Sequence, residues 1–194
     1  MKVISVCLLW LSLSSSAFSV AQRASAEVYF SPDDQVDRKL IELIEQERKS
    51  IRMAVYCLTH RAIGQALIDA KKRGVDVEVI VDRFSVKTRS PLAKMIQGGI
   101  PIYVWNSERQ KKKRMQRSLM HNKYCIFGND IVWSGSLNFT QEGPRIHQEN
   151  VLILRDEDLA LAYKMQFDKI KWRSCTPYAA YVAYQPKRQY KRAS

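Results

Sequence analysis

The residues best suited to chemistry lie in one stretch, residues 120–140, where His121 and Lys123 stand two positions apart. Alternation along a strand would put both side chains on one face, a nucleophilic imidazole beside a fixed positive charge. Ser136 and Asn138 follow a second apolar run and add two neutral hydrogen-bond donors. A nucleophile combined with donors for developing negative charge is what cleavage of a phosphate ester requires.

The order of these residues resembles the signature of the phospholipase D superfamily, His-x-Lys-x4-Asp followed by Gly-Ser-x-Asn. More narrowly, it is similar to the short bacterial endonucleases that carry this motif once. The resemblance implies that His121 forms a phosphohistidine, that Lys123 and Asn138 bind the non-bridging phosphate oxygens, and that Ser136 donates a supporting hydrogen bond. It also implies that Glu149 orients His121 through the second ring nitrogen.

The sequence departs from this signature at Gly128, where the motif has Asp; the nearest carboxylate is Asp130. Position 128 has the opposite strand parity to His121, so its side chain would point away from the reacting face. We therefore expect a structural role for the motif Asp, with Gly128-Asn-Asp forming a hairpin turn that Asp130 braces. The competing hypothesis is a weakened or inactive enzyme.

Covalent hydrolysis also needs an acid for the leaving oxygen, and one imidazole cannot stand on both sides of the phosphorus. The other two histidines, His60 at a predicted helix start and His147 in a loop, are expected to be ordinary surface residues. A single motif therefore predicts a homodimer in which two copies of His121 face each other across a two-fold axis. The resemblance implies the same arrangement.

The charge balance indicates a polyanionic partner, because 32 Lys and Arg stand against 19 Asp and Glu, a net charge of +13. Nucleic acid and an anionic membrane surface both fit this balance. Six basic residues precede the motif and are expected to clamp phosphates near the scissile bond, so cleavage should be nonspecific and salt-sensitive. A solvated charge run is the alternative. The six are Arg109, Lys111, Lys112, Lys113, Arg114 and Arg117.

No metal and no cofactor are expected, because no acidic cluster lies near the motif and no Cys-x-x-Cys spacing occurs. Cys57 and Cys125 lie in apolar, strand-like runs, which favours buried thiols. The fourth cysteine, Cys7, lies in the predicted signal peptide, so the mature chain would keep these two and Cys175, an odd set that allows at most one internal disulfide.

Residues 1–26 have the features of a signal peptide: Lys2, an apolar run over residues 3–13, and Ala24-Ser25-Ala26 before Glu27. An N-terminal anchor is the alternative. We expect a periplasmic or secreted protein with one domain over residues 27–174. Residues 175–194 should form a basic, Tyr-rich tail suited to stacking on single-stranded bases, with a disordered tail as the alternative.

The predicted elements indicate a mixed sheet flanked by helices, the α/β/α arrangement that the resemblance implies. Strand, helix and strand over residues 51–81 predict a crossover with parallel pairing, and Thr59 is the expected helix N-cap. The expected strands are at 28–30, 51–58, 75–81, 101–105, two around Gly128 and one at 151–154. The expected helices run from the start signal Ser31-Pro-Asp-Asp to about Lys49, from the Thr59 cap to Gly74, over 91–97 and from Asp156.

Together these features predict an exported, metal-independent, homodimeric endonuclease that hydrolyses DNA, with RNA as a further candidate substrate. One alternative is a phosphodiesterase of the same superfamily that acts on an anionic phospholipid such as cardiolipin. Because we expect no hydrophobic anchor in the mature chain, we favour the nuclease. The other alternative is a catalytically weakened nucleic-acid-binding protein.

Overall fold

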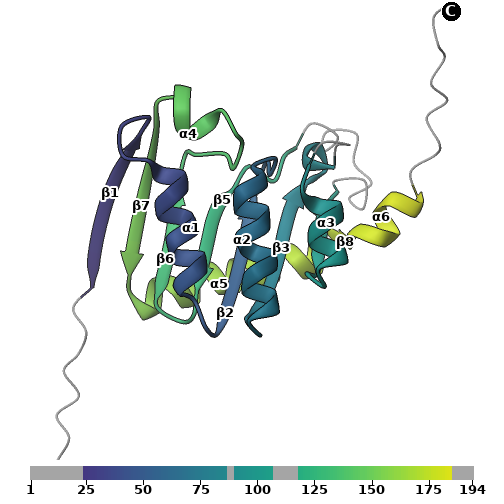
Figure 1. Cartoon of the computed structure of the whole chain (residues 1–194). Helices are drawn as coiled ribbons and strands as arrows, with labels where there is room; N and C mark the ends of the chain where they lie inside the picture. Colours follow the sequence, from purple (N-terminus) through teal and green to yellow (C-terminus); the bar gives the residue numbers. More distant parts are fainter. Residues whose placement is uncertain (1–23, 87–89, 107–117, 185–194) are drawn as a thin grey trace, which may run out of the picture.

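The protein is built on one mixed sheet of eight strands, in the order β1-β7-β6-β5-β2-β3-β4-β8 (Figure 1). The computed structural model describes residues 24–86, 90–106 and 118–184. The strands are β1 (Ser25–Ser31), β2 (Ser50–Val55), β3 (Asp76–Asp82), β4 (Ile102–Trp105), β5 (Lys123–Phe127), β6 (Ile131–Gly135), β7 (Glu149–Arg155) and β8 (Cys175–Pro177). The predicted mixed sheet is confirmed.

Helices cover both faces of this sheet, α1 to α3 on one side and α5 on the other (Figure 1). Successive side chains of β2 point to opposite faces of the sheet, so the core has two parts. Met53 belongs to the cluster with Leu40 and Leu67, whereas Ala54 belongs to the cluster with Phe167 of α5. The helices are α1 (Val36–Gln46), α2 (Arg61–Lys72), α3 (Leu92–Gln97), α4 (Gly143–Ile146), α5 (Glu157–Ser174) and α6 (Tyr178–Tyr184), with a 3₁₀ turn, η1 (Arg83–Ser85).

Strand directions bring the motif residues to one edge of the sheet. β2 and β3 are parallel through the α2 crossover, as predicted, and β5 runs antiparallel to β2 with Val55 opposite Lys123. β6 returns antiparallel to β5, with Tyr124 opposite Ser134. The carboxyl ends of β2, β3 and β6 therefore lie beside the amino ends of β5 and β7, and the loops at this edge carry the candidate site.

Gly128 lies in the turn between β5 and β6, at the other end of β5 from Lys123. The hairpin turn predicted there is confirmed: Gly128 has φ 56° and its N–H donates to Ser50 O at 2.9 Å. A five-residue strand separates this turn from the motif Lys by roughly 16 Å. Asp130 contributes to the turn through its carbonyl, which accepts from Asp156 N at 2.7 Å.

Two elements near the amino end begin at other residues than predicted. β1 starts at Ser25, not Val28, so Ser25 and Ala26 pair with Arg155 and Leu154 of β7. The first helix begins at Val36, although Ser31-Pro-Asp-Asp is typical of a helix start. Instead the Asp34 carboxylate accepts from Phe30 N at 2.7 Å and turns the chain before the helix.

The carboxyl-terminal segment is more ordered than the predicted tail over residues 175–194. Residues Cys175–Pro177 form β8, which pairs with β4 at the edge of the sheet, and α6 packs Tyr178 and Tyr181 against the core. A three-residue strand has too few positions to show a period in the sequence, and its pairing partner is about seventy residues away. Residues 185–194 lie outside the described residues. Among the helices described, none has the length and apolar character needed to cross a membrane.

Candidate active site

His121 and Lys123 lie together at the amino end of β5. Lys123 Nζ is 3.2 Å from His121 Nδ1 and donates to the His121 carbonyl at 2.7 Å. The imidazole is exposed, whereas the Lys123 side chain is only 7% exposed. This burial lowers the pKa of Lys123, and the negative charge of Glu149 opposes the shift. The predicted pairing of a nucleophile with a cation is present.

Tyr56, the first residue after β2, supports both of these side chains. Its ring centroid is 4.8 Å from that of His121 with an interplanar angle of 55°, and Lys123 Nζ lies 5.6 Å from the Tyr56 centroid. Its N–H donates to Asn122 O at 2.9 Å, which joins the end of β2 to the motif. Nothing in the spacing of the sequence indicated this residue.

Asp82, at the end of β3, fixes the segment that leads into His121. The Asp82 side chain is fully buried, and its Oδ2 accepts from Met120 N at 2.9 Å while Oδ1 accepts from Phe84 N at 3.0 Å. Burial raises the pKa of Asp82, and the two backbone donors pull it down. The sequence signal available was a carboxylate that ends an apolar strand, and its partner lies 38 positions away.

Ser136 and Glu149 come together from the ends of β6 and β7. Ser136 Oγ donates to Glu149 Oε2 and accepts from Asn150 N at 3.0 Å. The strands approach closely here because residue 135 is glycine: a Cβ on Gly135 would lie 2.1 Å from Asn150 O. The structure thus pairs Glu149 with Ser136 and does not show the predicted contact in which Glu149 would accept a hydrogen bond from a His121 ring nitrogen.

Asn138 lines a hollow of about 490 Å³ beside this pair, together with Tyr56, His147 and Glu149. Its Oδ1 is buried and has no hydrogen-bond partner among the described residues. An unsatisfied buried amide oxygen costs free energy unless a ligand or water meets it. The hollow is therefore suited to a polar group, and Tyr56, which contacts the His121 ring, is one of its lining residues.

The two remaining histidines differ from each other. His147 is exposed, as predicted, and lines the hollow. The prediction for His60 was wrong, because its side chain is 3% exposed. His60, not Thr59, caps α2: its Nδ1 accepts from Ile63 N at 3.4 Å, and its Nε2 lies 3.3 Å from Asp37 Oδ2. Burial lowers the pKa of His60.

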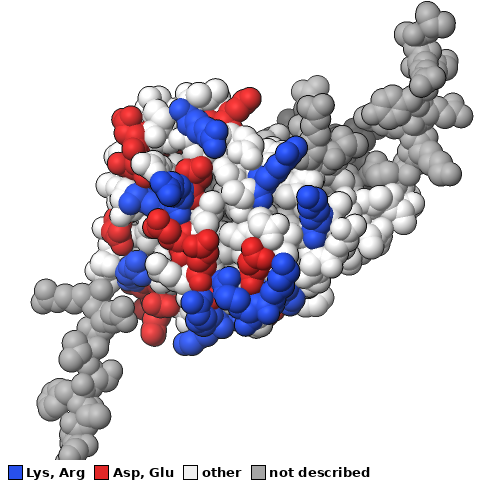
Figure 2. Space-filling view, viewed as in Figure 1, with Lys and Arg blue, Asp and Glu red and all other residues white. Residues whose placement is uncertain are grey.

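The basic residues predicted to bind substrate, from Arg109 to Arg117, lie outside the described residues. On the described part, Lys and Arg are mixed with Asp and Glu over the face covered by α1 and α2 (Figure 2). The net positive charge is thus not gathered on that face. No disulfide joins the three cysteines of the described residues; Cys125 and Cys175 are buried and Cys57 is partly exposed.

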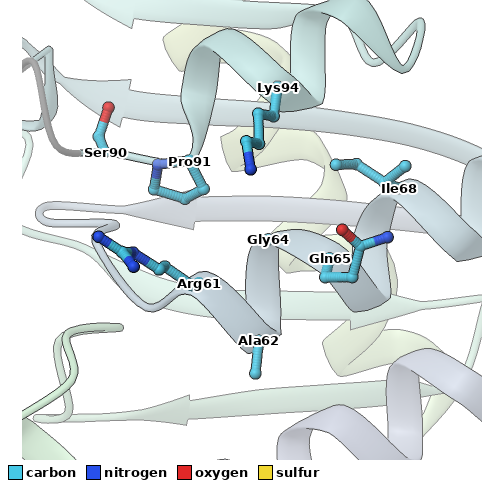
Figure 3. Close-up of a pocket in the computed structure, with 8 residues that line it drawn as sticks. All are labelled: Arg61, Ala62, Gly64, Gln65, Ile68, Ser90, Pro91 and Lys94. Atoms are coloured by element: carbon cyan, nitrogen blue, oxygen red, sulfur yellow. The ribbon is translucent and has the colours of Figure 1, made fainter.

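A second hollow, of about 580 Å³, lies between α2 and α3 (Figure 3). Arg61 and Lys94 line it from the two helices, with Ser90 and Pro91 at one end (Figure 3). None of the five motif residues borders it. It is therefore separate from the candidate site.

Comparisons with known proteins find similarity to phospholipase D-like proteins. A family described as "Cardiolipin synthase, PLD-like domain" matches residues 40–172. A phospholipase D of Rickettsia bellii is 30% identical over 146 residues, which cover 75% of this chain and 68% of that protein. A mitochondrial cardiolipin hydrolase of Xenopus tropicalis is 24% identical over 145 residues, covering 74% of this chain and 64% of that protein.

Two solved structures share the fold over nearly their whole length. Nuc from Salmonella typhimurium, a phospholipase D family member, has a TM-score of 0.70 and 28% identity, covering 80% of this chain and 99% of that one. NucT from Helicobacter pylori has a TM-score of 0.73 and 25% identity, covering 80% of this chain and 100% of that one.

Proposed function

The chain belongs to the phospholipase D superfamily and is a phosphodiesterase of it, and on that basis we propose that its substrate is nucleic acid. The proposed activity is nonspecific endonucleolytic cleavage of DNA, with RNA as a further candidate substrate, without a metal ion. The observation that carries the proposal is the exposed His121 with Lys123 Nζ 3.2 Å from its Nδ1, beside the Ser136–Glu149 pair.

In the proposed reaction, a nitrogen of His121 attacks the phosphorus and the bond to the leaving oxygen breaks. That oxygen takes a proton from a second imidazole on the opposite side, which leaves a phosphohistidine. Water then attacks the phosphorus, gives its proton to the second imidazole, and the phosphorus–nitrogen bond breaks. Lys123 and Asn138 would hold the non-bridging oxygens, on which negative charge accumulates.

The contact between Lys123 and His121 suggests how the imidazole is prepared. A charged ammonium has donors only, so His121 Nδ1 accepts from it and the ring proton lies on Nε2. Attack on phosphorus through Nε2 requires the other tautomer, with the ring proton on Nδ1. An arriving phosphate would draw the ammonium toward its oxygens and free Nδ1 to carry that proton, and the Glu149 carboxylate could then accept a hydrogen bond from Nδ1–H.

The second imidazole is proposed to be His121 of another copy, in a homodimer with a shared site. Within the described residues, His60 is buried under α2 and cannot serve. His147 lines the adjoining hollow and is the one intramolecular alternative among them. Export through a signal peptide over residues 1–26 remains part of the proposal.

A lipid phosphodiesterase is the second candidate, favoured by the relatives named phospholipase D and cardiolipin hydrolase. The resemblance to single-motif endonucleases favours nucleic acid, whereas the net charge of +13 fits either polyanion. Plasmid nicking and hydrolysis of cardiolipin vesicles, both measured in EDTA, separate the two. We expect plasmid nicking that weakens with salt, and no hydrolysis of the vesicles. Vesicle hydrolysis without nicking would instead identify the protein as a lipid phosphodiesterase.

A further inference from the structure

Three aromatic rings form a row that ends at the candidate nucleophile. The ring centroids of Phe84 and Tyr56 are 5.9 Å apart at 57°, and those of Tyr56 and His121 are 4.8 Å apart at 55°. We call Phe84, Tyr56 and His121 the aromatic row. Such tilted contacts stabilise ring pairs beyond the area that they bury. The row therefore joins η1 to the site through direct ring contacts.

The outer end of the row is open to solvent. The Phe84 side chain is 43% exposed, and the Arg83 guanidinium carbon lies 5.5 Å from its ring centroid. A single exposed apolar side chain is ordinary on a protein surface. Phe84 differs because its ring contacts Tyr56, which in turn contacts the His121 imidazole. It also lies near the Arg83 guanidinium, at the strand ends that carry the candidate site.

Hydrogen bonds hold this exposed ring in place. Phe84 N donates to the buried Asp82 carboxylate at 3.0 Å, and the same carboxylate accepts from Met120 N. Ser85, also buried, donates from Oγ to Tyr56 O at 2.8 Å and accepts from Leu58 N at 3.0 Å. η1 is thus tied both to the segment before His121 and to the segment after β2. These bonds fix the backbone of Phe84 relative to the segment that leads into His121.

We propose that Phe84 is a stacking platform for an unpaired base next to the scissile phosphate, so that the preferred substrate is single-stranded. This rests on the proposed nuclease function. In a duplex the faces of the bases are covered by their neighbours, whereas a single strand can turn one base onto an aromatic side chain. The Arg83 guanidinium lies over the same ring and adds positive charge there, which would attract the phosphates of that strand.

The test compares Phe84→Ala with Phe84→Tyr, which keeps the ring, and with Leu161→Ala, which removes a 56% exposed side chain from α5 on the other side of the sheet. Each variant is assayed on a single-stranded oligonucleotide, its duplex and the same strand with abasic sites. Losing one stacked base should raise KM on the single strand by about 5- to 150-fold for Phe84→Ala. kcat and duplex cleavage should change little, and Phe84→Tyr and Leu161→Ala should match the wild type.

The abasic strand provides a second, independent readout. The wild type should cleave it with the raised KM of Phe84→Ala on the intact strand, and Phe84→Ala should not distinguish the two strands. Unchanged KM for Phe84→Ala on the single strand would overturn the inference while leaving the nuclease intact. If the wild type cleaves no nucleic acid and Phe84→Ala instead weakens hydrolysis of cardiolipin vesicles, the proposed function and the inference both fall.

Discussion

Lys123 Nζ lies 3.2 Å from His121 Nδ1 at the edge of the sheet, and the Lys123 side chain is almost entirely buried there. A buried ammonium is unfavourable for folding, since it loses hydration that its few contacts replace only in part. The lowered pKa of Lys123 expresses this cost. A bound phosphate would supply the negative charge that the buried ammonium lacks. Charged groups that are unfavourable without a ligand are common at functional sites.

The first prediction concerns Lys123→Met, which keeps the length of the side chain and removes its charge. Cleavage should fall by about 10²- to 10³-fold, because the charge that stabilises the phosphorane oxygens is gone. The melting temperature should stay equal or rise, because the buried charge is removed. Thermal melts and initial rates measure the two effects; a lower melting temperature with nearly full activity would contradict the account. Lys164→Met, at an exposed position of α5, is the matched control.

The stability difference between Lys123→Met and the wild type should also depend on pH. The pKa of Lys123 is lower in the folded protein than its usual 10.5, so between the two values the unfolded chain binds more protons. The free energy of unfolding of the wild type therefore rises with pH through this window, relative to Lys123→Met. Any advantage of the variant should be largest at neutral pH and shrink toward pH 10. Denaturant titrations of both proteins measure it, and a constant difference would contradict the assigned cause.

A second prediction concerns Asp82, a positioning residue that does not touch the reacting atoms. Asp82→Asn keeps one oxygen acceptor, but its amide NH₂ would face a backbone N–H that now donates to the carboxylate. The free energy of unfolding should fall by about 1–3 kcal/mol. Because Met120 N would lose its partner, His121 should shift and kcat should fall about tenfold or more. The assay is run well below both melting temperatures. Asp33→Asn on the exposed surface is the control, and unchanged kcat with lowered stability alone would make Asp82 merely structural.

A third prediction addresses the residue that replaces the motif Asp. Gly128→Asp should give no gain in turnover, because the turn lies at the far end of β5. Its positive φ makes a side chain cost about 1 kcal/mol, and a Cβ there would lie 3.5 Å from Glu47 Oε2. Gly128→Asn introduces the same backbone strain without the negative charge. The difference in free energy of unfolding between the two variants therefore measures the repulsion between Glu47 and the carboxylate introduced by Gly128→Asp. A large gain in turnover for Gly128→Asp would show that the natural protein is a weakened enzyme.

A fourth prediction tests the shared site. Mixing wild-type and His121→Ala chains, unfolded together and refolded, should reduce activity with the square of the wild-type fraction if every site needs two copies of His121. A linear decrease would mean that one chain suffices. His147→Ala tests whether His147 of the same chain serves as the second imidazole. We expect nearly full activity from this variant, because His147 only lines the adjoining hollow.

Much of the fold could be predicted from the sequence because each main element carries its own local period. The stripe of α5, with Ala160 and Phe167 facing the sheet, and the Gly128 hairpin are examples. Asp82 and Tyr56 were missed because their roles come from contacts with Met120 and His121, far along the chain. The burial of His60 was missed for the same reason: Asp37 and the packing of α1 against α2 decide it.

The candidate site was predicted in part. The short spacing of His121 and Lys123 placed both on one side of the sheet, whereas Glu149 was expected only from the resemblance to the phospholipase D superfamily. The partner of Glu149 did not follow from spacing, because the close approach of β6 and β7 at Gly135 decides which group it meets.

The most direct test of the central claim is plasmid and oligonucleotide cleavage in EDTA by the wild type, His121→Ala and His147→Ala. We expect wild type and His147→Ala to cleave without added metal, and His121→Ala to lose at least about 10³-fold in rate while melting at the same temperature. Cleavage by His121→Ala at the wild-type rate, or cleavage that requires Mg²⁺ in every protein, would show that His121 is not the nucleophile of a metal-independent enzyme.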